Sequence, residues 1–101
     1  AIAMLPRVVD AVGHRLEVMM DGGVRNGQDV VKALALGARA VMLGRAWIYA
    51  LAGRGEAGVR HVLSLIQKEM AVTLALTGVP RARDVSAEVL HESSRAGKPA
   101  E

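Results

Sequence analysis

The sequence predicts an α/β fold with parallel strands, and three observations lead to this class. An apolar run over 16–20 ends in Asp21 and a Gly-Gly pair, and a second run over 40–43 ends in Gly44. A helical pattern follows each run, so each is predicted to be a strand that enters a helix through glycine, with a spacing typical of parallel neighbours. The chain has 101 residues, whereas a (β/α)8 barrel needs about 250, so at most it forms the last part of such a barrel.

Composition and charge argue against several classes of function. The chain has no cysteine, which removes disulfides and thiolate metal sites, and we expect no metal site. The net charge of +3 comes from scattered arginines rather than from a basic block, so we expect no nucleic-acid partner. The apolar stretch 33–52 contains Arg39 and Arg45, which are costly inside a bilayer, so we interpret it as part of a folded domain.

Local signals predict the first elements. Pro6 suits the first turn of a helix that ends at Gly13, and the strand over 16–20 follows. Asn26 is expected to cap the next helix, with Asp29 completing an approximate capping box. Gly37 suits the left-handed position at the end of that helix. Its buried face is predicted to contain Val30, Val31, Leu34 and Ala35.

Two helices are predicted after the second strand. The first covers 46–51, and we interpret its aromatic residues, Trp47 and Tyr49, as core-filling side chains. Gly53 and Gly55 separate it from a longer helix over 56–76. That helix is predicted to end at Gly78 and Pro80. The apolar face of the longer helix is predicted to contain Val59, Val62, Leu63, Ile66, Met70, Thr73 and Leu74.

The remainder of the chain is predicted to be less regular. Residues 84–90 suit one further helical turn with Ser86 as its cap. After His91 the composition turns small and polar, which is typical of a loose segment. We therefore divide the chain into a structured unit over 1–90 and a flexible tail over 91–101.

The two glycine junctions are predicted to form one divided phosphate site. In parallel α/β proteins the carboxyl ends of the strands form the functional face, where glycine lets backbone amides approach an anion. Asp21 suits the hydroxyl groups of a polyol, while Arg25 and Arg45 supply positive charge. The alternative is that the glycines only form tight turns and the arginines are solvated. The predicted site contains Asp21, Gly22, Gly23, Val24, Arg25, Gly44 and Arg45.

Longer motifs surround these junctions. Asp-Gly-Gly-Val-Arg-Asn-Gly occupies 21–27, Lys-Ala-Leu-Ala-Leu-Gly-Ala occupies 32–38, and Gly-Glu-Ala-Gly-Val occupies 55–59. Together with Gly44-Arg45 and Leu-Thr-Gly at 76–78, they resemble the C-terminal end of the FMN-dependent 2-hydroxy-acid dehydrogenases and oxidases. That family includes L-lactate dehydrogenase, glycolate oxidase and mandelate dehydrogenase. The resemblance covers most of the chain, from about Leu5 to Leu90.

The resemblance implies a fold, a cofactor and a reaction. The fold would be a (β/α)8 TIM barrel to which this chain supplies strands 7 and 8 with their helices. The cofactor would be FMN, with the seven junction residues around its ribityl and phosphate groups. The parent protein would oxidise a small 2-hydroxy acid, similar to L-lactate, to a 2-oxo acid.

The resemblance also implies that the chemistry lies outside this segment. The family's histidine base and its carboxylate-binding arginine belong to a motif upstream of the region present here. His14, His61 and His91 do not match that histidine. We therefore name no catalytic residue and expect the segment alone to be inactive.

Other functions are left open by the sequence. IMP dehydrogenase and the type 2 isopentenyl diphosphate isomerase share the Gly-Gly loop, and a noncatalytic phosphate-binding or self-assembling βα module would need only the junctions. The downstream half, especially Gly44-Arg45, favours the hydroxy-acid family. Because both sheet edges would be open, we expect association with the missing barrel units or with copies of the chain. The expected location is cytoplasmic, or peripheral to the inner membrane in the full-length protein.

Overall fold

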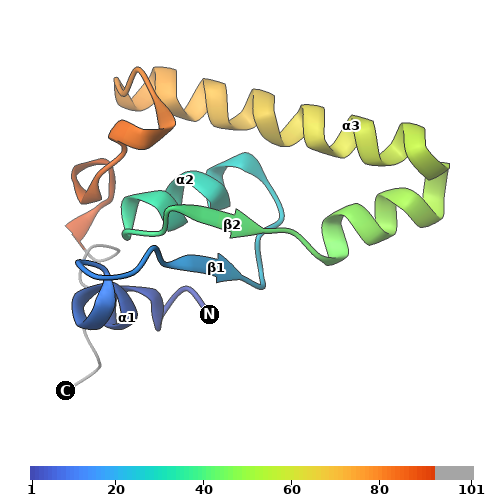
Figure 1. The fold of residues 1–101 in the computed structure, drawn as a ribbon. Helices are drawn as coiled ribbons and strands as arrows, with labels where there is room; N and C mark the ends of the chain where they lie inside the picture. Colours follow the sequence, from blue (N-terminus) through green and yellow to red (C-terminus); the bar gives the residue numbers. More distant parts are fainter. Residues whose placement is uncertain (93–101) are drawn as a thin grey trace.

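A parallel pair of strands lies at the centre of the computed structural model, which describes residues 1–92 (Figure 1). β1 (Met19–Asp21) pairs with β2 (Ala40–Met42), so that Met19 faces Ala40 and Asp21 faces Met42. The predicted α/β class with parallel neighbouring strands is confirmed. The other elements are α1 (Leu5–Val12), α2 (Gly27–Ala35), α3 (Arg45–Thr77) and two 3-10 turns, η1 (Ala82–Asp84) and η2 (Ala87–Val89).

The first strand begins later than the apolar run predicts. Leu16 was expected to open the strand, but it is exposed in the turn after α1. The backbone N–H groups of Arg15 and Leu16 both donate to the carbonyl of Val12, at 2.9 and 2.8 Å. The helix is therefore still closing its last turn where the apolar run starts, and strand pairing begins only at Met19.

α2 begins and ends at the predicted residues. The Asn26 side chain caps it by accepting a hydrogen bond of 2.8 Å from the amide of Asp29. The Asp29 carboxylate accepts from the amide of Arg25 at 3.0 Å, so the capping box extends into the preceding loop. At the other end Gly37 has a φ of 108°, which glycine adopts without strain. The buried side chains of α2 are those of Val30, Val31, Ala33 and Ala35. Leu34, which was predicted to be on the buried face, is half-buried.

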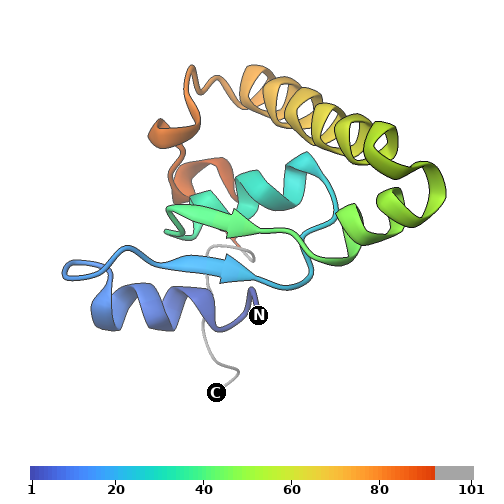
Figure 2. The same ribbon diagram turned by 45° about the vertical axis from the view of Figure 1, so that its right-hand side comes forward.

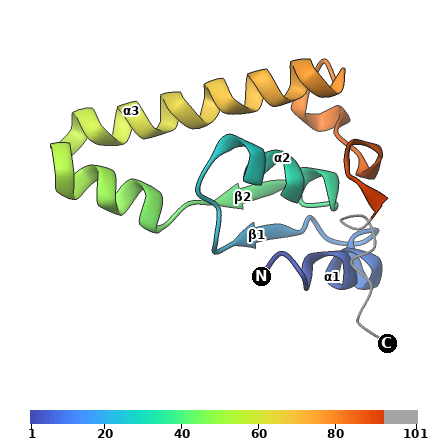
Figure 3. The same cartoon turned by 180° about the vertical axis from the view of Figure 1, so that it is seen from behind.

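α3 contains the two helices that the sequence predicts, joined at a sharp break. The backbone at Arg54 and Gly55 is non-helical, within the predicted separator at 53–55. After the break the second part of α3 runs back alongside α2 (Figure 3). Ile66 on the predicted apolar face is buried, whereas Leu63 is 49% exposed.

The helical turn predicted within 84–90, with Ser86 as its cap, is present as η2, and η1 precedes it. η1 and η2 are separate 3-10 turns, and Ser86 caps the second by accepting from the amide of Glu88 at 3.4 Å. Gly78 ends α3 in the left-handed conformation, as predicted. Most of the tail that we expected to be flexible, residues 93–101, lies outside the described residues.

One hydrophobic cluster holds the helices to one face of the sheet. On the other face Met19 is 61% exposed, Met42 is 52% exposed, and Ala40 and Asp21 are exposed too. Side chains alternate between the two faces of a strand, so helices cover only one face and the described residues leave the other bare. The buried members of the cluster are Leu5, Val18, Met20, Val24, Val30, Ala33, Ala38 and Ile66.

α2 touches the backbone of α3 at Gly27. A Cβ atom placed on Gly27 would lie 2.5 Å from the carbonyl oxygen of Ile66 and would also overlap the backbone nitrogen of Met70. The amide of Gly27 donates to the Glu69 carboxylate at 3.3 Å. Only glycine permits so close an approach, so this residue sets the distance between the start of α2 and the middle of α3.

We predict that Gly27→Ala destabilises the fold by about 1–3 kcal/mol, because the added methyl group overlaps backbone that cannot rotate away. Urea unfolding followed by circular dichroism measures the change. Gly53→Ala is the matched control, since a Cβ atom there meets nothing within 4 Å and the backbone is helical. It should be neutral or slightly stabilising. Equal midpoints for the two variants would contradict the contact at Gly27.

We also predict that the 101-residue chain self-associates through the bare face of its sheet. Sedimentation velocity over a range of concentrations should reveal oligomers, and Met19→Lys should weaken them because it places a charge on that face. Val72→Lys, a change at a similarly exposed residue of α3 (57%), is the control. A dilute monomer with a sharp cooperative melt would contradict this expectation.

Candidate functional site

The carboxyl ends of β1 and β2 bring both glycine junctions to one edge of the sheet. The two strands point the same way, toward the start of α3 (Figure 2). All seven residues of the predicted site line one hollow of about 290 Å³ at this edge, which we call the junction hollow. Arg25 and Arg45 therefore border a common space. The sequence analysis missed two lining residues, Met42 and Ala46.

The parallel register explains the two residues that were missed. Met42 pairs with Asp21, so the last residue of β2 stands beside the last residue of β1. Ala46 lies in the first turn of α3, next to Arg45. A register deduced from the sequence would have been enough to include Met42, because partners in a parallel pair end at the same edge.

The loop after β1 leaves room beside its backbone. Gly22 and Gly23 have φ values of 99° and 77°, a conformation that residues with side chains rarely adopt. A Cβ atom on Gly23 or on Gly44 would meet nothing within 4 Å, so both residues border open space. Val24 is buried in the hydrophobic cluster and anchors the loop. A ligand can therefore approach the backbone closely from both junctions.

Within residues 1–92 the two arginines of the junction hollow form no ion pair, although the Asp21 carboxylate lines the same hollow. Among residues 1–92 the ion pairs join Arg60 with Glu56 and Arg81 with Asp84, and neither pair lies at this site. The guanidinium groups of Arg25 and Arg45 are exposed and have no carboxylate partner in this part of the chain. Two such groups beside one space favour a doubly charged anion.

The two helices that follow the junctions differ at their N-termini. Two of the first three amides of α2 are bonded to side chains, since Gly27 donates to Glu69 and Asp29 donates to Asn26. No side chain caps α3 at Gly44, and the first amide bonded within that helix is that of Ile48. α3 therefore offers more open amides at its positive end than α2 does. Our expectation of an anion at a helix start fits α3 better than α2.

These features fit the phosphate and ribityl groups of FMN. Arginine side chains and open backbone amides suit a phosphate, and the exposed carboxylate of Asp21 suits polyol hydroxyl groups. The volume of the junction hollow is close to the lower end for a small-molecule site, about 300 Å³, which suits part of a ligand rather than all of it.

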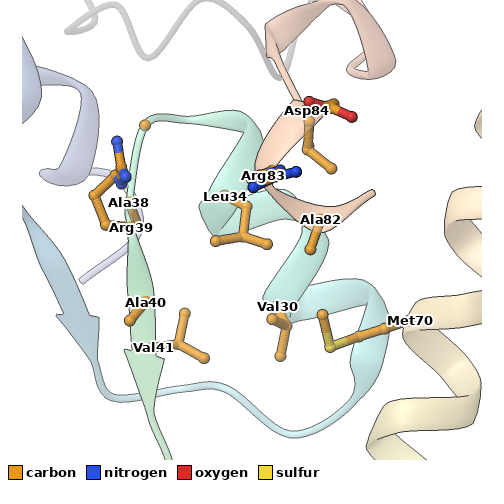
Figure 4. A pocket seen from close by; sticks show the side chains of 12 residues that line it. Val30, Leu34, Ala38, Arg39, Ala40, Val41, Met70, Ala82, Arg83 and Asp84 are labelled. Atoms are coloured by element: carbon orange, nitrogen blue, oxygen red, sulfur yellow. The ribbon is translucent and has the colours of Figure 1, made fainter. Parts of the chain in front are cut away.

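A larger hollow, of about 730 Å³, lies at the other end of β2 (Figure 4). Apolar side chains of α2 and α3 line it together with the charged residues Arg39, Arg83 and Asp84. It lies at the amino end of β2, whereas the functional face of a parallel sheet lies at the carboxyl ends of its strands. The predicted site therefore stays with the junction hollow, and Arg39 offers a useful comparison with Arg45.

The aromatic residues of α3 do not fill a core as predicted. Tyr49 is 70% exposed and Trp47 is 38% exposed. The Trp47 indole N–H donates to the carbonyl of Leu43 at 2.7 Å, which fastens the first turn of α3 to the end of β2. The expectation was wrong because the described chain supplies nothing to cover this side of the helix.

The histidines lie away from the junction hollow. His14, His61 and His91 are all exposed, and none lines that hollow. Across residues 1–92 no three acidic, histidine or cysteine side chains gather closely enough to hold a metal ion. The same residues contain no helix with the length and apolar character needed to cross a membrane.

The chain is similar in sequence to known L-lactate dehydrogenases and to an L-lactate oxidase. The chain is 59% identical over 88 residues to an L-lactate dehydrogenase of Caulobacter vibrioides, which covers 87% of the chain and 23% of the relative. It is 49% identical over 87 residues to an L-lactate oxidase of Nostoc sp.. This match covers 86% of the chain and 24% of the relative. The chain thus spans about a quarter of the length of these relatives.

Solved structures agree with the sequence matches. A soluble mutant of the membrane-associated (S)-mandelate dehydrogenase from Pseudomonas putida superimposes with a TM-score of 0.84 at 46% identity, over 89% of this chain and 25% of the other. Flavocytochrome b2 superimposes with a TM-score of 0.85 at 33% identity, over 99% of this chain and 27% of the other.

The resemblance found in the sequence motifs is confirmed by these comparisons. The family model for FMN-dependent dehydrogenases matches residues 1–92. Because this match covers most of its length, the chain belongs to the FMN-dependent dehydrogenase family.

Proposed function

We propose that this chain is the FMN phosphate- and ribityl-binding segment of an enzyme that oxidises a small 2-hydroxy acid to a 2-oxo acid. FMN is the cofactor of the family to which the chain belongs. The observation that carries the proposal is the convergence of Arg25 and Arg45 on the junction hollow. In the described part of the chain no carboxylate pairs with either guanidinium group.

Each site residue has a proposed role. Arg25 and Arg45 bind the phosphate, with the backbone N–H groups at Gly44 and Arg45 assisting at the start of α3. Gly22, Gly23 and Val24 shape the loop beside the ribityl chain, and Asp21 accepts from its hydroxyl groups. Bound FMN would supply the electron acceptor for the hydroxy acid. The segment itself positions the cofactor and contributes no catalytic base, so it should be inactive alone.

The chain is proposed to supply the last two strands of a (β/α)8 barrel, strands 7 and 8, with residues 1–90 as its final βα units. Its bare sheet face and open edges support this, because a closed barrel covers both. Its match to about a quarter of each relative is also what two strands of eight would give. The segment would pair with the preceding barrel units or, without them, with copies of itself.

An L-lactate-like compound is the proposed substrate of the parent protein. The relatives named L-lactate dehydrogenase and L-lactate oxidase support this choice. A cytoplasmic location is proposed, with peripheral membrane attachment as the alternative, since the Pseudomonas putida (S)-mandelate dehydrogenase is described as membrane-associated.

A chimera tests the proposed function directly. Residues of this chain replace the matching 88 residues of the Caulobacter vibrioides enzyme. We expect the chimera to purify yellow with bound FMN and to oxidise L-lactate, whereas the 101-residue chain alone should show no activity. Loss of FMN from a folded chimera would contradict the cofactor assignment, and activity of the isolated chain would show that it contains a base.

In the same chimera, Arg25→Ala or Arg45→Ala should weaken FMN binding by about 1.5–3 kcal/mol, because each removes charged hydrogen bonds to the phosphate. Fluorescence titration of the apoprotein measures this loss. Riboflavin, which lacks the phosphate, should bind each variant as it binds the unmodified chimera. Arg39→Ala is the matched control, since that arginine lies at the other end of β2. Unchanged FMN affinity in both arginine variants would remove the assignment.

A further inference from the structure

α3 contacts both halves of the candidate phosphate site. Its first residue, Arg45, lines the junction hollow directly. After the break at Arg54 and Gly55, its second part returns to the start of α2 (Figure 3). There the Glu69 carboxylate accepts the hydrogen bond from the amide of Gly27, a residue 42 positions earlier in the sequence.

Gly27 directly follows the loop that carries Arg25. The other hydrogen bonds that hold this junction are local, since Asp29 accepts from the amide of Arg25 and Asn26 accepts from the amide of Asp29. These local bonds fix the shape of the loop but not its position relative to α3. The bond from Gly27 to Glu69, with the backbone contact beside it, ties the loop to the second part of α3, which the break at Arg54 and Gly55 joins to the part that carries Arg45.

We propose that Glu69 is a positioning residue for the phosphate site. By holding the Gly27 amide, its carboxylate sets where Arg25 stands relative to Arg45. This inference rests on the proposed function, because it assumes that the two arginines share one phosphate. Glu69 does not line the junction hollow, so it acts through the loop rather than on the ligand.

The charge of Glu69 has a second consequence for the site. A carboxylate at the N-terminus of α2 satisfies an open amide and offsets the positive end of that helix dipole. The phosphate is thereby left to the uncapped start of α3, between the two arginines. Removing the carboxylate would both loosen the loop and free the Gly27 amide at the start of α2.

The test uses the chimeric protein and two ligands, FMN and riboflavin. Glu69→Ala should weaken FMN binding about threefold to tenfold, the effect expected of one lost hydrogen bond, and leave riboflavin binding unchanged. Glu69→Gln keeps a side-chain oxygen that can accept from the Gly27 amide, and its side chain has the same length. It should therefore keep most of the FMN affinity of the unmodified chimera. Glu69→Asp keeps the charge but withdraws it by one methylene, so it should bind FMN as weakly as Glu69→Ala. Gln67→Ala, at an exposed residue of the same helix, is the control.

The outcomes separate this inference from the proposed function. If the unmodified chimera binds FMN no better than riboflavin, the phosphate site itself is wrong. If it prefers FMN and both Glu69→Ala and Glu69→Asp keep that preference in full, only the role of Glu69 is overturned. Equal loss of both ligands together with a lower unfolding midpoint would also overturn it, because that pattern marks a purely structural residue.

Discussion

The parallel pairing of β1 with β2 is the interaction on which the rest of this structure depends. Met19 faces Ala40 and Asp21 faces Met42, so the two strands end level with each other. Because the strands run in the same direction, the loops that follow them leave the sheet side by side. Two glycine-arginine junctions that are separated in sequence thereby border one hollow. A shift of the register or an antiparallel pairing would move Arg25 and Arg45 apart and leave two unrelated turns.

The same pairing explains why the chain presents so much apolar surface. Two strands give a sheet with one face covered by helices and another on which Met19 and Met42 are exposed. Tyr49 and Leu76 of α3, at 70% and 83% exposed, add to this surface. A barrel closes its sheet on itself and surrounds it with helices, so such surfaces become interior only when the remaining units are present. The exposed apolar surface is consistent with a partial barrel, and the chain spans about a quarter of the length of its relatives.

Helix ends decide which junction offers amides to an anion. Both junctions have the glycine and the arginine that a phosphate site requires, but at α2 the amides of Gly27 and Asp29 already have partners in Glu69 and Asn26. At α3 no side chain takes that place in the described structure. A site with two arginines and one open helix start is better matched to a single phosphate than two equivalent helix starts would be. In the proposed site this asymmetry would place the phosphate at the start of α3.

The sequence by itself determined the features that arise from neighbouring residues. Pro6, Asn26, Gly37 and Gly78 predicted helix ends because capping bonds and left-handed turns join residues only a few positions apart. The two glycine junctions likewise identified seven of the nine residues that line the junction hollow. Tertiary structure alone decided that Ala33 is fully buried and that Glu69 reaches Gly27. These outcomes depend on contacts between elements distant in the chain, whose energies no local pattern of residues contains.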